Sequence, residues 1–482
     1  MKRSHLNFTT LYIFILFFLG SLRHFLLGSN RWDMGIFEQF SWLIANFRAY
    51  EISSIRGIAP LEDHFSLLLF PIGLIYKIIP STYTLIAIQS IGIGCLFYLI
   101  LRFARQRVDN QKIYLSILIS LLLCPYLFLV NLADFHPEVV IVPIMFLAAT
   151  EVTSDNKYIY YPLLLISLFA KKSQVLFGLG LSIYAFIKGK KTKGISTLLI
   201  SFFWWSISSR YSAVSGDYIA ARLGYLGENN LEIVTTLVTS PWKIFVEAPP
   251  DSIFLYIFGL ILPFLALLNK RAIPSLIATF PVLITNIISS SGMQRELNQH
   301  YSISIMPFIL LGCLESLEEI DVSRKQVVNR IYYTTIILSI IGFLGYARIG
   351  YFSSRYIPRL EESINFHKVK VLIPSSSSIL TSRDYEPHFA NRALVKSFAY
   401  DNEFSVNEVQ NNLNEQYLPL SKYDYIVLPE RDNYVSKKGK LRLLRNTFGD
   451  SHREAIIKDA ENLSFECKKM NKHITLCSKE GS

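Results

Sequence analysis

The segment NRWDMG, residues 30–35, opens a polar stretch that the tripeptide EDH, residues 62–64, closes. Apolar runs lie on both sides of this stretch, so its ionisable groups are expected at a membrane boundary. Charged side chains are unfavourable there and usually serve a function. Asp33, Asp63 and His64 are therefore the first candidates for a functional site.

The composition indicates several membrane-spanning helices. The chain has 482 residues, of which 51% are apolar and 14% aromatic, and its mean hydropathy is +0.33. Apolar residues come in runs from Leu11 to about Gly350, and charged residues become frequent from Tyr351 onward. We expect a mainly α membrane domain over residues 1–350, with about eleven transmembrane helices, and a small α/β soluble domain over residues 351–482.

One apolar segment, residues 65–79, is expected not to cross the membrane. It contains Pro71 and Gly73, and as a helix it would reach about 22 Å against a hydrocarbon core of about 30 Å. The expected spans are residues 8–27, 82–101, 113–131, 138–151, 158–170, 175–188, 194–209, 252–269, 272–290, 301–317 and 331–347.

The distribution of basic residues among the loops predicts which side of the membrane each loop faces. If residues 65–79 stay on one side, most Lys and Arg residues fall in loops on the side of the N-terminus. Because positive loops remain in the cytoplasm, we expect a multi-pass protein of the bacterial inner membrane with a cytoplasmic N-terminus and an extracytoplasmic C-terminal domain. The net charge of +11 then reflects topology, and no nucleic-acid partner is expected.

The same topology gathers ionisable residues on the extracytoplasmic face. They are Asp33, Asp63, His64, Asp134, His136, Glu138, Lys171, Lys172, Arg295 and His300, with Tyr301 beside the last. A purely structural helix bundle has little reason to collect carboxylates, imidazoles and lysines on one side.

The acidic residues of the first outer segment have two interpretations each. Asp33 could accept a proton from an acceptor hydroxyl, or it could cap the helix expected over residues 36–47. Asp63 and His64 could position a substrate, bind a divalent cation, or cap the helix of residues 65–79.

The motif DFHPE, residues 134–138, is a second candidate. Asp134 and His136 could both face one site, where they would orient a substrate or bind Mg²⁺ or Mn²⁺. Alternatively, Pro137 and Glu138 are an ordinary helix start.

Basic residues on the extracytoplasmic face are candidates for phosphate binding. Lys171 and Lys172 depart from the positive-inside pattern, and ammonium groups at headgroup level can bind a lipid phosphate. Alternatively, their flanking spans form a shallow hairpin. Arg295 is a second phosphate candidate, and His300 and Tyr301 are expected to contact the same substrate.

The tail shows the pattern of a small α/β layer. Strands are expected at residues 369–373 and 425–428, and helices at residues 405–415 and 437–448. Neither GxGxxG nor a P-loop occurs, so no nucleotide is expected. Cys467 and Cys477 could pair if the tail faces an oxidising compartment.

Six motifs resemble a family of membrane proteins called domain of unknown function 2079. They are DMGIFEQ (33–39), DHFS (63–66), DFHPE (134–138), HYS (300–302), PSSSSIL (374–380) with PH (387–388), and DYIVLP (424–429). This family is in turn similar to membrane glycosyltransferases of the GT-C fold, which include protein O-mannosyltransferases and aminoarabinose transferases of lipid A.

The resemblance implies a polyprenyl-phosphate sugar as donor, with basic residues near its phosphate. It places the catalytic base on Asp33 and a second acidic motif on residues 134–138. One departure is that Lys172-Ser173-Gln174 stands where an acidic residue is expected. The function expected is therefore inverting transfer of a hexose or pentose to an acceptor hydroxyl. The alternatives are a transporter of lipid or polyprenol-linked substrates and a non-catalytic membrane scaffold.

Overall fold

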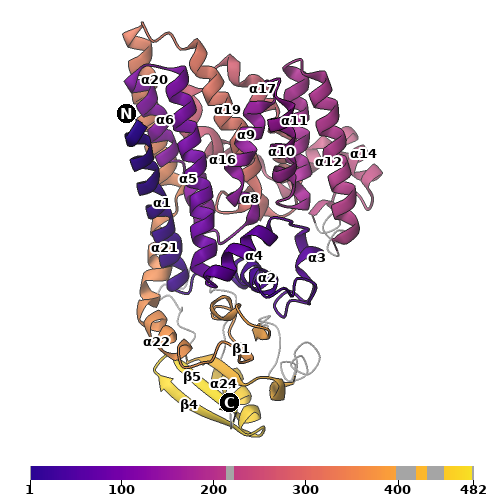
Figure 1. Ribbon diagram of the computed structural model, residues 1–482, viewed down its shortest axis with the longest axis vertical. Helices are drawn as coiled ribbons and strands as arrows, with labels where there is room; N and C mark the ends of the chain where they lie inside the picture. The colour runs from indigo at the N-terminus through magenta and orange to yellow at the C-terminus, as the bar shows by residue number, and fades with distance from the viewer. Residues whose placement is uncertain (1, 213–221, 398–418, 431–449, 480–482) are drawn as a thin grey trace. The chain divides into compact units, whose positions relative to one another are not determined.

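The computed structural model describes residues 2–212, 222–397, 419–430 and 450–479 (Figure 1). The chain divides into two compact units. The helical unit comprises Met1–Ser21, Pro60–Ile72 and Tyr83–Ile349, and the sheet unit comprises Leu22–Ala59, Gly73–Thr82 and Gly350–Ser482. The final segment of the sheet unit begins at Gly350, next to the predicted boundary. The other two segments, Leu22–Ala59 and Gly73–Thr82, were not predicted to join the tail.

The helical unit is built almost entirely from α-helices, which run alongside one another in Figure 1. Its helices are α1 (Lys2–Phe25, which continues into the sheet unit), α3 (Pro60–His64), α5 (Thr82–Arg107), α6 (Gln111–Leu122), α7 (Pro125–Leu132), α8 (Pro137–Val140), α9 (Val142–Glu151), α10 (Lys157–Leu168), α11 (Val175–Ile187), α12 (Lys191–Tyr211), α14 (Asn230–Thr239), α15 (Ile244–Glu247), α16 (Pro250–Ile261), α17 (Ile273–Ile277), α18 (Phe280–Ile288), α19 (Met306–Ser316) and α20 (Lys325–Tyr346).

The protein is a multi-pass membrane protein, and every predicted span falls on helical structure. Within the described residues, six helices are long and apolar enough to cross a membrane, or up to seven if one bent pair counts as a span. Several of the other predicted spans, such as α9, α10 and α11, are shorter helices. The total of eleven spans therefore stays a prediction.

Prolines explain several of the breaks. Pro125 begins α7 after a break of two residues from the end of α6, and Pro281 lies in the first turn of α18. A proline has no backbone N–H to donate, so it fits the first turn of a helix but interrupts a longer one. The helices before and after the break at residues 278–279 are bent by 61°.

The segment of residues 65–79 contains only one short helix, α4 (Leu69–Ile78), which has 10 residues. At 1.5 Å per residue it covers about 15 Å, roughly half of a hydrocarbon core. The predicted span α9 has the same length, so length does not decide the matter, and the expectation that residues 65–79 do not cross the membrane stays a prediction. The orientation of the chain in the membrane stays a prediction.

The sheet unit holds five strands with the spatial order β2-β1-β3-β5-β4. They are β1 (Ile379–Thr381), β2 (Val395–Ser397), β3 (Tyr425–Pro429), β4 (Phe465–Asn471) and β5 (Ile474–Lys479). β1 is parallel to β2 and β3, whereas β5 is antiparallel to β3 and β4. The unit also contains α2 (Ile36–Ala45), α21 (Ile349–Tyr356), α22 (Leu360–Lys370) and α24 (Asp450–Glu461).

The apolar core of the sheet confirms the predicted α/β character of the tail. Leu380, Ile426 and Leu428 from the central strands pack with Ile456 and Ala460 of α24. The continuous apolar run at residues 425–428 correctly predicted β3, and these four residues are all buried.

The strand predicted at residues 369–373 was wrong. Most of this segment is the end of α22 and the turn after it, because Glu362, Phe366 and Val369 are buried at helical spacing while Val371 is 84% exposed. The helices predicted at residues 405–415 and 437–448 lie outside the described residues. Cys467 and Cys477 occupy opposed positions of β4 and β5 and form a disulfide.

Candidate active site

Seven of the predicted site residues meet within the helical unit, where segments distant in sequence converge. We call them the Lys171 cluster: Asp63, His64, His136, Glu138, Lys171, His300 and Tyr301. Lys171 Nζ lies 3.4 Å from Glu138 Oε1 and 3.4 Å from His300 Nε2. His300 Nε2 lies 3.5 Å from the same Glu138 oxygen, so the three side chains form a triangle.

Aromatic and acidic neighbours extend the cluster. The rings of His136 and His300 stack with their centroids 3.7 Å apart, and the ring of Tyr301 lies 4.2 Å from that of His300. Asp63 Oδ2 lies 2.5 Å from His64 Nδ1.

The turn that carries Asp134 and His136 is fixed by Gln89 of α5. The Gln89 side-chain amide donates to Asp134 O (2.8 Å), and its carbonyl oxygen accepts from the His136 backbone N–H (2.8 Å). Asp134 has a φ of 72°, in the left-handed region that Asp and Asn tolerate better than most residues. Pro137 then starts α8 and turns Glu138 into the buried interior.

Electrostatics in the Lys171 cluster favour a charged lysine. Burial alone would lower the pKa of Lys171, but the carboxylates of Glu138 and Asp63 outweigh burial and raise it. Burial and the nearby Lys171 charge lower the pKa of His64. The site therefore presents a buried ammonium group, and burial disfavours the protonated form of the nearby His64 imidazole.

Glu138 Oε2 and His300 Nδ1 are buried atoms of the cluster with no hydrogen-bond partner within the described residues. Buried polar atoms are rarely left unsatisfied, and those that are often serve a ligand. An anionic group with a hydroxyl or a bound water nearby would satisfy both the lysine and these atoms.

Lys172 and Arg295 are not brought into the cluster. Arg295 donates to the backbone carbonyls of Ser289 (2.6 Å), Glu247 (2.7 Å) and Ile287 (3.1 Å), so it ties loops together. Lys172 begins a short 3-10 turn, η2 (Lys172–Gln174), and no ion pair joins it to the described residues. Their roles in phosphate binding stay predictions, with Lys171 better placed.

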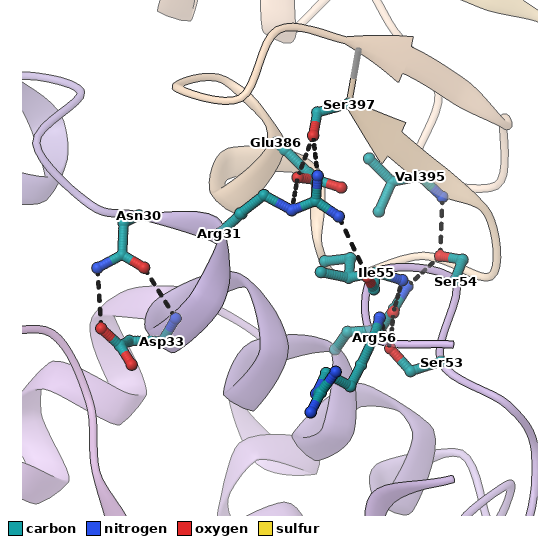
Figure 2. Close-up of polar contacts among 11 residues, drawn as sticks. Asn30, Arg31, Asp33, Ser53, Ser54, Ile55, Arg56, Glu386, Val395 and Ser397 are labelled. Atoms are coloured by element: carbon teal, nitrogen blue, oxygen red, sulfur yellow. Dashed lines mark hydrogen bonds and ion pairs between the residues drawn. The ribbon is translucent and has the colours of Figure 1, made fainter. Parts of the chain in front are cut away.

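Asp33 lies in the sheet unit, on a π-helical turn, η1 (Arg31–Gly35), that leads into α2 (Figure 2). Asn30 Oδ1 accepts from the Asp33 backbone N–H (2.9 Å), and Asn30 Nδ2 donates to Asp33 Oδ2 (2.9 Å). The alternative in which Asp33 caps the helix was wrong, because Asn30 is the N-cap of η1 and Gly35 is the N-cap of α2. The Asn30 cap instead orients the Asp33 carboxylate, and π turns are frequent at functional sites.

The structure adds no third ligand to Asp134 and His136, the two residues predicted to bind a divalent cation, among the residues that it describes. Among the residues that the structure describes, no three His, Cys, Asp or Glu side chains converge as a metal site requires. Asp134 and His136 alone do not fit Mg²⁺ or Mn²⁺ well, since these ions prefer several oxygen ligands. A cation at these two residues stays a prediction, and no chemical step is derived through it.

Sequence reasoning missed the residues that hold the site in place. Gln89 is a buried amide within an apolar run, which is itself a signal of a specific role. Asn30 stands three residues before Asp33, the spacing of a helix capping box. Both signals are visible in the sequence.

An Asp134→Asn variant separates the charge of this residue from its backbone role. Asn tolerates the left-handed conformation as well as Asp does, so we expect the melting temperature to stay unchanged. If the carboxylate orients the donor, turnover should fall about 10-fold or more. Asp134→Ala is the control for the turn and should lose about 1 kcal/mol of stability, measured by thermal unfolding. Full turnover in the Asn variant would leave Asp134 a turn residue only.

The fold of the chain is similar to that of ArnT from Cupriavidus metallidurans bound to undecaprenyl phosphate, with a TM-score of 0.55 and 11% identity over 99% of this chain and 98% of that chain. The apo state of that protein gives a TM-score of 0.45 and 11% identity over 92% of this chain and 93% of that chain. The first of these comparisons shows that the chain has an ArnT-like GT-C fold.

Residues 23–454 match the family described as predicted membrane protein (DUF2079), and the chain belongs to this family. None of the curated proteins matches it. At 11% identity, the likeness to ArnT shows the fold alone.

Proposed function

We propose that this protein is a GT-C-type glycosyltransferase that moves a sugar from a polyprenyl-phosphate donor to an acceptor hydroxyl. The reaction takes place on the extracytoplasmic face of a bacterial inner membrane, with the N-terminus in the cytoplasm and the C-terminal domain outside. Support comes from the fold, from the undecaprenyl phosphate bound by ArnT, and from the Lys171 cluster.

The Lys171 cluster carries the proposal. A buried ammonium group is favourable only with anionic partners, and here Glu138 balances it through one carboxylate oxygen at 3.4 Å. The lysine has three donors, so it can bind Glu138 and a phosphate oxygen together. His300 and the ring of Tyr301 supply the polar and aromatic surface that a sugar phosphate requires.

The proposed chemistry is a single displacement. Asp33 takes the proton of the acceptor hydroxyl, and the oxygen attacks the anomeric carbon of the donor. The bond from that carbon to the phosphate oxygen breaks, and its electron pair leaves with the polyprenyl phosphate. Lys171 stabilises the charge on this leaving group, and the configuration at the anomeric carbon is inverted. His136 and Asp134 orient the donor.

The proposal is tested with the full-length protein in lipid nanodiscs. Membranes of the native host supply the acceptors, and polyprenyl-phosphate sugars with a radiolabelled hexose or pentose are the donors. Label that moves from the lipid fraction to an acceptor in an enzyme-dependent manner supports the proposal. Label that crosses the bilayer without transfer favours a transporter, and neither event over the whole donor set favours a scaffold.

A further inference from the structure

The turn that carries Asp33 is attached to the C-terminal part of the sheet unit by a buried ion pair (Figure 2). Arg31 Nε lies 3.1 Å from Glu386 Oε2, and the two side chains are only 12% and 0% exposed. Glu386 begins a 3-10 turn, η10 (Glu386–Phe389), close to the start of β2. Arg31 is the first residue of η1, so the attachment lies two residues from Asp33.

Ser397, at the end of β2, links both members of the pair. Its hydroxyl accepts from Arg31 Nη1 (2.8 Å) and donates to Glu386 Oε2 (2.7 Å). Arg31 Nη2 also donates to the backbone oxygen of Ile55 (3.3 Å), which belongs to the loop after α2. One guanidinium group therefore joins η1, the loop after α2, and the tail.

A second set of contacts fixes the same loop to β2. Ser54 Oγ accepts from the Val395 backbone N–H (3.1 Å), and Gln39 Nε2 donates to the Arg392 carbonyl (3.2 Å). The Gln39 oxygen accepts from the Ile55 N–H (2.9 Å). These contacts hold the loop after α2 against the tail. The position of η1 relative to the tail is therefore fixed by more than the Arg31 contacts.

Removing the charges of Arg31 and Glu386 from water is unfavourable. Burial raises the pKa of Glu386, and Arg31 partly offsets that rise. A buried pair of this kind adds little net stability compared with apolar residues, and its best-attested use is to fix register. The position fixed here is that of η1.

We propose that Arg31 is a positioning residue for Asp33 and that Glu386 and Ser397 act through it, so the tail is part of the catalytic apparatus. This inference rests on the proposed function. A shift of about 1 Å in a reacting group can lower turnover about 100-fold, which is the size of effect expected when the attachment is removed.

Kinetics of the full-length protein in nanodiscs test the inference. Arg31→Met and Glu386→Gln should each lower kcat about 100-fold and leave the KM for the labelled donor within about twofold, because neither residue binds the donor. Arg31→Lys keeps the charge and should recover part of kcat. A rise in KM at full kcat, or no change in either constant, would overturn the positioning role.

Thr381→Val is the matched control. Thr381 Oγ1 donates to the Val427 carbonyl (3.0 Å), a buried hydrogen bond in the same sheet that does not involve residues 30–56. The control should lose stability yet keep kcat. An equal loss of kcat in this variant would show that Arg31→Met acts through general destabilisation, and the inference would fail.

Amide hydrogen exchange separates this inference from the proposed function. In Glu386→Gln, the amides of residues 31–36 should exchange about 10-fold faster than in the wild type, whereas Thr381→Val should leave them unchanged. If the wild type transfers no sugar, the proposed function fails while the exchange rates still decide whether the tail holds η1. If transfer is present but exchange and kcat are unaffected, only the inference fails.

Discussion

Asp33→Asn is expected to abolish sugar transfer while the protein stays folded. The Asn side chain has the shape of Asp and can still accept the hydrogen bond from Asn30 Nδ2, so η1 should keep its conformation. It cannot take a proton from the acceptor, and loss of a general base typically lowers turnover about 100- to 10,000-fold. The measurement is single-turnover transfer from labelled donor, with the melting temperature recorded for each variant.

Glu38→Gln provides the matched control for Asp33→Asn. Glu38 lies five residues further along the same motif, where it accepts hydrogen bonds from Tyr76 (3.0 Å) and Thr82. Burial raises the pKa of this carboxyl, so a neutral side chain already suits the position. We expect turnover within about threefold of the wild type. Undiminished transfer in Asp33→Asn would remove Asp33 from the mechanism.

Loss of the Lys171 ammonium is expected to have the second-largest effect. Without it a donor phosphate loses its cationic partner, and removing one member of a buried charge pair costs about 2 kcal/mol or more. This corresponds to a fall in kcat/KM of about 30-fold or more. Lys171→Met alone also leaves Glu138 buried without its counter-charge, so the variant should lose stability as well.

The double variant Lys171→Met/Glu138→Gln distinguishes these two effects. It removes both charges, so the melting temperature should recover towards that of the wild type while kcat/KM stays low. Lys172→Met, one residue away, tests whether any nearby lysine suffices, and its effect should stay below about threefold. Recovery of kcat/KM in the double variant would show that Lys171 balances Glu138 and does not bind the donor.

Local patterns predicted the helices well because apolar runs and basic loops report directly on membrane insertion. The same patterns also predicted which segments of the helical unit would share a site, since Lys171, Glu138 and His300 were assigned to one face. The direct contacts between these side chains depend on the positive φ of Asp134 and the amide of Gln89, which topology alone does not give.

The strand prediction at residues 369–373 was wrong because these residues are compatible with both a strand and the end of a helix. Residues 369–373 (VKVLI) have the apolar, β-branched composition of a strand, but Phe366 and Val369 belong to a helical face that starts further upstream. The link from Arg31 to Ser397 joins residues 366 positions apart, so no local pattern carries it. Contacts of this kind are decided by tertiary packing.

The attachment of Arg31 to Glu386 also sets an order of events during biosynthesis. A ribosome delivers residue 31 long before residue 386, and membrane helices insert as they emerge. Until synthesis of the tail is nearly complete, residues 30–56 lack the partners that hold them. A chain shortened before residue 386 would keep its apolar helices but would lack the ion pair that fixes η1.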